Sequence, residues 1–230
     1  MITVLMDYDG TLHDHDAVIT RSIDGILGHP GHRLYQTWRY RIHRDIIHTQ
    51  HLDRHDDMLF HAQLLFQHLQ KPYHHPTAQK LVQKFHEADQ TAKDTPIYFP
   101  DAIPTLSTLK DYGITLCLST GRNAEEKAET LARHTGTRHF THVFSEPALG
   151  CLKTEPEYYR KALKQAGADP STTYSVGDTP LSDIRPANLT GITTIWLNRV
   201  DEPPPTAPDA TPHHTATTLT QATEIILKHT

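Results

Sequence analysis

The strongest constraint on the fold is a series of short apolar segments that alternate with helical patterns. Five of them have the length of buried strands: residues 2–6, 114–118, 142–144, 173–176 and 192–197. Parallel strands joined by helices need right-handed crossovers, which place helices on both faces of the sheet. The chain is therefore predicted to contain an α/β domain with a Rossmann-like parallel sheet.

Residues that end or begin helices support this alternation. Three predicted helices are each followed by a glycine that suits a left-handed stop: Gly113 after 101–112, Gly136 after 124–134 and Gly167 after the helix that ends at 166. Asn123 and Thr154 are predicted to cap the second and third of these helices, because their side chains can accept a hydrogen bond from a free backbone N–H.

About a hundred residues separate the first two predicted strands, although a crossover needs only about a dozen. Amphipathic helices are predicted in this gap, at 17–27, 34–49, 56–69 and 77–91. We expect two domains: an α/β core of residues 1–13 and 95–230, and an inserted all-helical domain of residues 14–94. The Pro- and Thr-rich segment 201–218 is predicted to be a surface connection before a last helix at 219–228.

Composition limits the classes of partner. The chain has 22 basic and 27 acidic residues, a net charge of -5, which does not favour nucleic acid or an anionic membrane. The N-terminal apolar stretch is too short for a signal peptide, so we expect a cytoplasmic protein, monomeric or weakly dimeric. Cys117 and Cys151 match no zinc or redox spacing and are predicted to be reduced thiols.

Histidines and arginines cluster in the predicted helical domain. The chain has 19 histidines, and six of these lie at 43, 48, 51, 55, 61 and 68. Some share a helix face and would suit a metal site, but compositional bias explains them more simply. Trp38, Arg39, Arg41 and Arg44 would suit a substrate carboxylate or second phosphate, and a solvated helix face with Trp38 in the core is the alternative that we favour.

Carboxylates follow two predicted strands. Asp7 and Asp9 come directly after the first strand and precede Gly10, while Asp178 follows the strand 173–176 and Asp183 lies five residues further on. The carboxyl ends of parallel strands meet at one edge of a sheet, where ligands bind. Neighbouring carboxylates repel unless a cation or a shared proton offsets them, and a hard divalent ion with oxygen ligands would do so. A turn or helix cap remains the alternative for any one aspartate.

Two other strand ends supply groups that bind anions. The strand 114–118 is followed by Ser119, Thr120, Gly121 and Arg122, which offer hydroxyls and backbone N–H groups at a helix start. Lys153 follows the third strand and brings a positive charge toward the same edge. His13 and His15 lie beside the first strand end and are further candidates for contact with substrate.

In this arrangement the sequence resembles the haloacid dehalogenase (HAD) superfamily. Its four motifs match Asp7-Tyr8-Asp9-Gly10-Thr11, Ser119, Lys153, and Gly177-Asp178 with Asp183, in the right order along the whole α/β domain. The resemblance is to phosphatases of the phosphoglycolate phosphatase type. It implies that the helical insert is a cap domain between the first and second motifs.

The resemblance also implies roles for these residues. Asp7 would be the nucleophile that forms an aspartyl-phosphate, and Asp9 the general acid and base. Mg²⁺ would be held by Asp7, the Asp9 backbone carbonyl and Asp178. The remaining roles are as follows: Ser119 and the Thr120 amide bind phosphoryl oxygens together with Gly121 and Arg122, Lys153 neutralises charge, Asp183 orients Lys153 or metal-bound water, and Thr11 positions Asp9.

The predicted function is therefore Mg²⁺-dependent hydrolysis of a small phosphorylated metabolite. Dehalogenases of the superfamily lack an acid at the position of Asp9, so its presence favours phosphate substrates. A phosphomutase similar to β-phosphoglucomutase would share every catalytic residue, and a non-catalytic protein that binds a phosphate ligand is a further alternative. Thr120 replaces a frequent asparagine, and Thr154 stands where many relatives have a proline.

Overall fold

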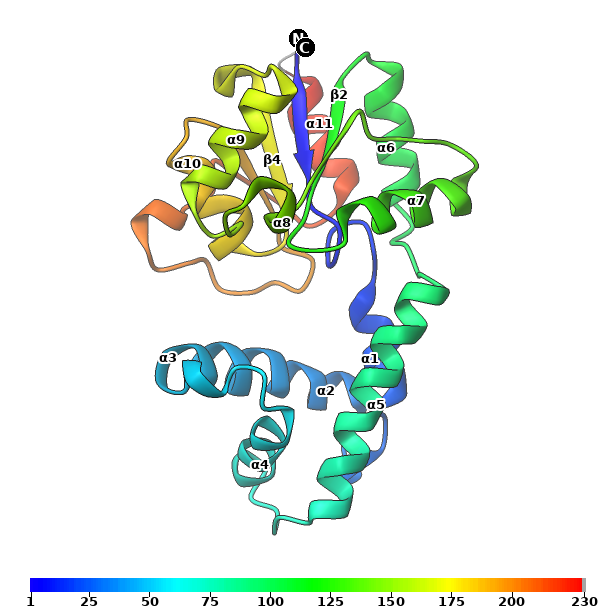
Figure 1. Cartoon of the computed structure of the whole chain (residues 1–230), viewed down its shortest axis with the longest axis vertical. Coiled ribbons are helices and arrows are strands. Elements are labelled where there is room, and N and C mark those ends of the chain that lie inside the picture. The colour runs from blue at the N-terminus through cyan, green and yellow to red at the C-terminus, as the bar shows by residue number, and fades with distance from the viewer. Residues whose placement is uncertain (229–230) are drawn as a thin grey trace. The chain divides into compact units, whose positions relative to one another are not determined.

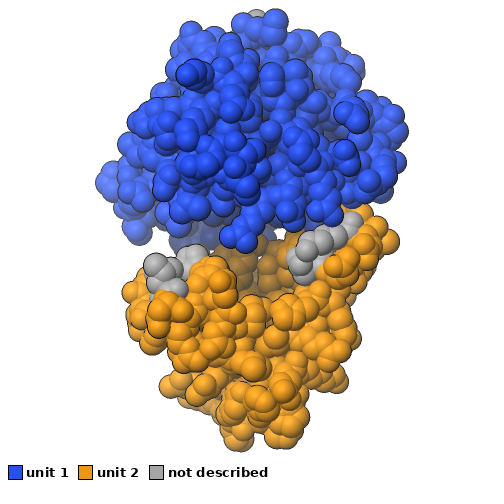
Figure 2. Space-filling model, in the orientation of Figure 1, with its two compact units in different colours: residues 1–14, 98–230 blue, residues 15–97 orange. Residues whose placement is uncertain are grey.

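The computed structural model describes residues 1–228, apart from the side chains of His48, Leu52, Asp89 and Lys93. The chain divides into two compact units, coloured separately in Figure 2. Residues 1–14 and 98–230 form what we call the sheet unit, and residues 15–97 form the helical unit. The predicted boundaries at 14 and 94 lie close to these limits, and the assignment of the two units as core and cap domains stays a prediction.

The sheet unit is built on a six-stranded parallel sheet with the order β3-β2-β1-β4-β5-β6. Its strands are β1 (Thr3–Met6), β2 (Thr115–Ser119), β3 (His142–Phe144), β4 (Thr173–Gly177), β5 (Thr193–Leu197) and β6 (His214–Ala216). The strand order reverses at β1, because β2 and β3 follow it on one side of the sheet and β4, β5 and β6 on the other. Such a reversal is where α/β sheets bind ligands.

Helices cover both faces of this sheet (Figure 1). On one face lie α6 (Ala102–Asp111), α7 (Ala124–Thr135) and α11 (Leu219–Leu227), and on the other α8 (Glu146–Leu149), α9 (Pro156–Ala166) and α10 (Arg185–Asn188). Alternate residues of β1 point to opposite faces of the sheet. Val4 and Met6 pack on the face covered by α6, α7 and α11, and Leu5 packs on the face covered by α8, α9 and α10. The predicted Rossmann-like sheet with helices on both faces is confirmed.

The helical unit packs around its own apolar core. Its elements are α1 (His15–Ser22), η1 (Ile26–Gly28), α2 (Gly31–Gln36), η2 (Thr37–Ile47), α3 (His48–Gln50), η3 (Leu52–Arg54), α4 (Met58–His68) and α5 (His75–Asp94). Trp38, Leu65 and Phe85 are among the buried residues at its centre. An all-helical region inserted directly after β1 was predicted and is confirmed.

Several predicted details of the sheet unit are wrong. The segment 201–218 is not only a surface connection, because it contains η6 (Pro208–Ala210) and the edge strand β6, which pairs with β5. Asn123 has a left-handed backbone (φ 56°) and its side chain does not cap α7. Thr154 does not cap α9 either, because Pro156 begins this helix, a position where the missing N–H has no cost.

Predicted helix ends in the helical unit are also partly wrong. The helix expected at 17–27 ends at Ser22, since Gly25 and Leu27 both have left-handed backbones. The one expected at 34–49 is three consecutive segments, of which η2 is π-helical. The sequence period of 3.6 residues does not apply to a π-helical segment, so a single regular helix over 34–49 was the wrong description. The left-handed stops at Gly113, Gly136 and Gly167 are confirmed.

The two connections between the units are tied together within the sheet unit. The Phe99 N–H donates to the carbonyl of Leu12 at 2.9 Å. Arg199 donates to the Thr11 carbonyl at 3.0 Å and to both carboxylate oxygens of Asp101, at 2.9 and 3.2 Å. The chain therefore leaves and re-enters the sheet unit at one fixed place.

Among the described residues, no helix has the length and apolar character needed to cross a membrane.

Candidate active site

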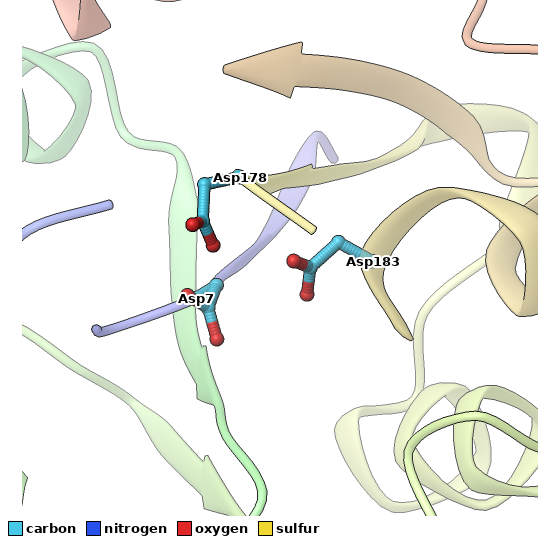
Figure 3. A group of neighbouring side chains, drawn as sticks. All are labelled: Asp7, Asp178 and Asp183. Carbon is cyan, nitrogen blue, oxygen red and sulfur yellow. The ribbon is translucent and has the colours of Figure 1, made fainter. Parts of the chain in front are cut away.

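Two strand ends at the centre of the sheet bring three carboxylates together. Asp7 follows β1 and Asp178 follows β4, the strand beside it, while Asp183 comes from η5 (Pro180–Ile184). Figure 3 shows the three carboxyl groups directed toward a common region. One oxygen from each lies within 4.8 Å of the others, which is the spacing of ligands around a metal ion.

Lys153 joins two of these carboxylates. Its Nζ lies 2.6 Å from Asp7 Oδ1 and 2.6 Å from Asp183 Oδ1, and it also donates to the Ser119 carbonyl at 2.8 Å. Burial acts to lower the pKa of Lys153, but Asp183 and Asp7 raise it well above its ordinary value. Burial raises the pKa of Asp7, although Lys153 acts against this. The lysine is therefore charged near neutral pH and holds Asp7 in place.

Two glycines allow this close packing. Gly10 has a left-handed backbone (φ 83°), and a Cβ at this position would collide with the carboxylate of Asp178. A Cβ on Gly177 would collide with Asp183. Glycine is needed at both positions because the acidic side chains occupy the space of a side chain.

These residues line a cavity of about 320 Å³ in the sheet unit. Its lining carries five carboxylates, of Asp7, Asp9, Glu146, Asp178 and Asp183, against the three cationic side chains of Arg122, Lys127 and Lys153. The excess of two negative charges, together with the cluster of carboxylate oxygens, fits a hard dication such as Mg²⁺. The residues present thus suit the predicted metal.

Asp9 is held by two partners. His13 Nδ1 lies 2.8 Å from Asp9 Oδ1, and Lys127 Nζ donates to Asp9 Oδ2 at 2.6 Å. Burial acts to raise the pKa of Asp9, but the His13 hydrogen bond and the Lys127 ammonium hold it well below its ordinary value. Asp9 is thus a carboxylate here. The buried Thr11 hydroxyl has no hydrogen-bond partner in the described part of the chain, so the role of Thr11 in positioning Asp9 stays a prediction.

The loop after β2 differs from the predicted pattern of contacts. The Ser119 hydroxyl donates to Tyr158 OH at 3.3 Å, and Ser119 is not among the residues that line the cavity. The Thr120 amide, predicted to bind phosphate, donates instead to the Phe144 carbonyl at 3.1 Å. The side chain of Thr120 does line the cavity, as do Gly121 and Arg122. The hydroxyl available to an anion thus comes from Thr120.

Sequence reasoning missed two residues of the site. Lys127, on α7, contacts both Asp9 and Thr120 Oγ1, the latter at 2.9 Å. Glu146, at the start of α8, accepts a hydrogen bond from the Lys153 N–H at 2.9 Å and so fixes the loop that carries this lysine. Glu146 lies two residues after the end of β3, which is a signal that the sequence carried. Lys127 has no such signal, because it lies inside a helix.

The candidate residues in the helical unit have other partners. Arg39 pairs with Asp16 at 2.8 Å, and Arg41 and Arg44 both pair with Asp45. Trp38 is buried in the core of the unit, as the favoured interpretation predicted.

Among the described residues, one group of side chains has the spacing of metal ligands, and it consists of Asp7, Asp178 and Asp183. The described histidines of the helical unit form no such group. The side chain of His48 lies outside the described residues.

Residues 1–191 match the family model of haloacid dehalogenase-like hydrolases. Since this is more than half of the chain, the protein belongs to the haloacid dehalogenase-like hydrolase family, as its resemblance to the HAD motifs predicted. The match includes every site residue described above.

Two curated relatives are phosphatases. The chain is 32% identical over 116 residues to a phosphoserine phosphatase of Thermus thermophilus, a match that covers 50% of this chain and 46% of the relative. It is 37% identical over 103 residues to a glyceraldehyde 3-phosphate phosphatase of Methanopyrus kandleri, covering 44% and 43%. The matches thus span less than half the length of these relatives.

Solved structures show the same fold across the whole chain. The putative HAD-hydrolase YfnB from Bacillus subtilis, whose structure was solved with bound magnesium, superimposes with a TM-score of 0.69 at 18% identity, covering 98% of both chains. The L-2-haloacid dehalogenase from Xanthobacter autotrophicus gives a TM-score of 0.62 at 18% identity, covering 100% of both. At such identities the likeness shows the fold.

Proposed function

We propose that the protein is a Mg²⁺-dependent phosphatase that hydrolyses a small phosphorylated metabolite through an aspartyl-phosphate on Asp7. The observation that carries the proposal is the position of Asp7, 2.6 Å from the Lys153 ammonium and grouped with Asp178 and Asp183 at the switch point of the sheet. The names of the phosphatase relatives support it.

The proposed reaction has two displacements at phosphorus. In the first, a carboxylate oxygen of Asp7 attacks phosphorus, the ester P–O bond breaks, and the leaving oxygen takes a proton from Asp9. In the second, water attacks the same phosphorus and gives a proton to Asp9, while the bond to Asp7 breaks and inorganic phosphate leaves. Asp9 is ionised in the free site, so it needs a proton that a phosphate monoester can bring.

Mg²⁺ is the proposed cofactor, held by Asp7, Asp178 and the backbone carbonyl of Asp9, with Asp183 close by. It would offset the charge of the nucleophile and of the phosphate, so that two anionic groups can approach each other. Lys153 contributes a fixed positive charge to the same end, and Asp183 keeps its ammonium in place. The magnesium bound to the B. subtilis relative supports the choice of metal.

The substrate is proposed at the level of its class. Relatives act on phosphoserine and on glyceraldehyde 3-phosphate, both small phosphate monoesters. Phosphoglycolate, a sugar phosphate or a nucleotide fits the same site chemistry. We further propose that residues 14–94 act as a cap domain that selects the substrate, and that the protein works in the cytoplasm as a monomer or weak homodimer.

The test is phosphate release from 4-nitrophenyl phosphate with and without Mg²⁺, followed by a panel of phosphorylated metabolites. We expect Mg²⁺-dependent turnover that Asp7→Asn abolishes, because an amide is not a nucleophile here. Asp111→Asn, at an exposed position, is the matched control and should keep full activity. Turnover by Asp7→Asn, or turnover without a divalent ion, would contradict the mechanism. Transfer to a second sugar hydroxyl instead of water would identify a mutase.

A further inference from the structure

Lys127 is a second lysine at the active site, and it belongs to none of the four motifs. It lies on α7, where its side chain is about one-fifth exposed and lines the same cavity as Asp7 and Lys153. Its Nζ donates to Asp9 Oδ2 at 2.6 Å and to Thr120 Oγ1 at 2.9 Å, and it lies 5.4 Å from the centre of the Tyr8 ring. The ammonium is therefore fixed at the cavity wall.

Lys127 and Thr120 each keep one hydrogen-bond donor that is not used by the contacts found among the described residues. An ammonium group has three donors, and Asp9 and Thr120 use two of those of Lys127. Thr120 Oγ1 accepts from Lys127, so its own hydroxyl proton is free to be donated elsewhere. Each of the two side chains can thus offer one donor to an acceptor in the cavity. A phosphoryl group, with several anionic acceptor oxygens, is such a ligand.

Two other donors near the end of β2, the Ser119 hydroxyl and the Thr120 amide, already have partners within the protein. The Ser119 hydroxyl donates to Tyr158 and the Thr120 amide to Phe144, so neither points a hydrogen into the cavity. Lys153 already contacts three oxygens, of Asp7, Asp183 and Ser119. Other donors to an anion bound here would have to come from Gly121 and Arg122, which also line the cavity.

From this arrangement we propose that Lys127 and Thr120 form an oxyanion-binding pair that holds the phosphoryl group of the substrate beside Asp7. The proposal rests on the proposed phosphatase function and adds a residue to it.

The experiment measures binding of inorganic phosphate, the reaction product, to the full chain in the presence of Mg²⁺ by calorimetry, together with kcat and KM for 4-nitrophenyl phosphate. Lys127→Met should weaken phosphate binding by about tenfold or more, since it removes a hydrogen bond from a charged donor. Lys127→Arg should recover part of the affinity, because the charge remains. Thr120→Val, which keeps the shape, should weaken phosphate binding a few-fold.

Control measurements separate this role from a structural one. Arg133→Met removes one positive charge from the exposed surface of the same helix and should leave phosphate binding unchanged. The affinity for Mg²⁺ should not fall in any variant, because Lys127 touches none of the three clustered carboxylates and its removal takes away a positive charge. If Lys127 only supported Asp9, Lys127→Met would lower kcat and leave phosphate affinity intact, and that result would overturn the proposal.

The outcome is also separable from the fate of the proposed function. Wild-type protein that binds phosphate through Lys127 but hydrolyses no ester would refute the phosphatase and keep the oxyanion-binding pair. Wild-type hydrolysis combined with unchanged phosphate affinity in Lys127→Met and Thr120→Val would keep the phosphatase and refute the pair. If Lys127→Met does not fold, Thr120→Val decides alone.

Discussion

Both units of the protein bury titratable side chains, but they do so in different ways. In the sheet unit, Lys153 and Asp183 are buried and charged, and each lies 2.6 Å from an opposite charge. In the helical unit, His61 is equally buried but sits among rings, 5.5 Å from the ring centres of both Trp38 and His43. Burial lowers the pKa of His61, so this ring is neutral near pH 7.

The difference separates packing from chemistry. A buried charge pair costs desolvation and contributes little net stability, so its presence indicates a use beyond folding. A neutral buried imidazole behaves mainly as a flat packing element. The charged group in the sheet unit is therefore the expected site of reaction, and the imidazole group in the helical unit is expected to matter for stability alone.

The largest effect should come from removing the buried ammonium of the sheet unit. Lys153→Met leaves Asp7 and Asp183 buried without their partner, which should lower the free energy of unfolding by about 3–5 kcal/mol and abolish phosphate release. Urea unfolding in EDTA, so that no dication replaces the lost charge, measures the first effect. Lys164→Met, at an exposed position of α9, the helix that follows Lys153, is the control and should change neither quantity.

A stable but inactive Lys153→Met variant would contradict the expected loss of stability. It would mean that the two carboxylates take up protons at little cost, and that the lysine serves the reaction and not the fold.

A smaller effect is expected from acid on the helical unit. Folding lowers the pKa of His61 from its ordinary value of 6.5, so the unfolded chain binds this proton more tightly than the folded one. The free energy of unfolding is therefore unaffected by His61 well above pH 6.5 and falls as the pH drops below it. The loss should reach at most about 1.4 kcal/mol per pH unit for this one proton. Urea unfolding at pH 7.5 and 5.5, followed by the fluorescence of Trp38 in a Trp196→Phe background, measures it.

Replacing the titrating ring sharpens this measurement. His61→Gln should lower stability at every pH but show a shallower dependence on pH than the parent. The same slope in both proteins would assign the acid sensitivity to other histidines of the helical unit.

The smallest effect should follow from the exposed arginines. Arg41 is two-thirds exposed and pairs with Asp45 one helical turn away, so Arg41→Ala should change the free energy of unfolding by about 0.5 kcal/mol or less. KM for the preferred phosphate ester should not change. An increase in KM of tenfold or more would revive the alternative that this cluster grips a second anionic group of the substrate.

The sheet was predictable because its strands carry local signals. The strand at 142–144 was predicted with its observed limits, and the other four within one residue at each end. Strand β6 was not, because its three residues lie in a Pro- and Thr-rich stretch and their pairing with β5 is a long-range contact. Asp7 and Asp178 could be found because each directly follows a strand, and topology alone brings strand ends together. Lys153 lies further on, in the loop after α8, and the HAD motifs singled it out more firmly than its distance from β3 did.

The rest of the site depends on contacts that no local pattern encodes. Whether Ser119 or Thr120 faces the cavity depends on the last residue of β2, an uncertainty of one position that reverses the direction of a side chain. Lys127 looks like a surface lysine on an amphipathic helix, and only the packing of α7 against the sheet brings it to Asp9. The helical unit was predicted as a set of helices, but left-handed residues such as Gly25 and the π-helical segment shifted their limits.

The hydrogen bond between Phe99 and Leu12 has a consequence for modularity. Since the two ends of the insert are already side by side, the α/β fold closes without the intervening 80 or so residues. A short turn joining His13 to Tyr98 would span the gap, because the two residues already pair as a β-bridge. The insert can therefore be exchanged during evolution, or by design, while the site residues of the sheet unit keep their arrangement.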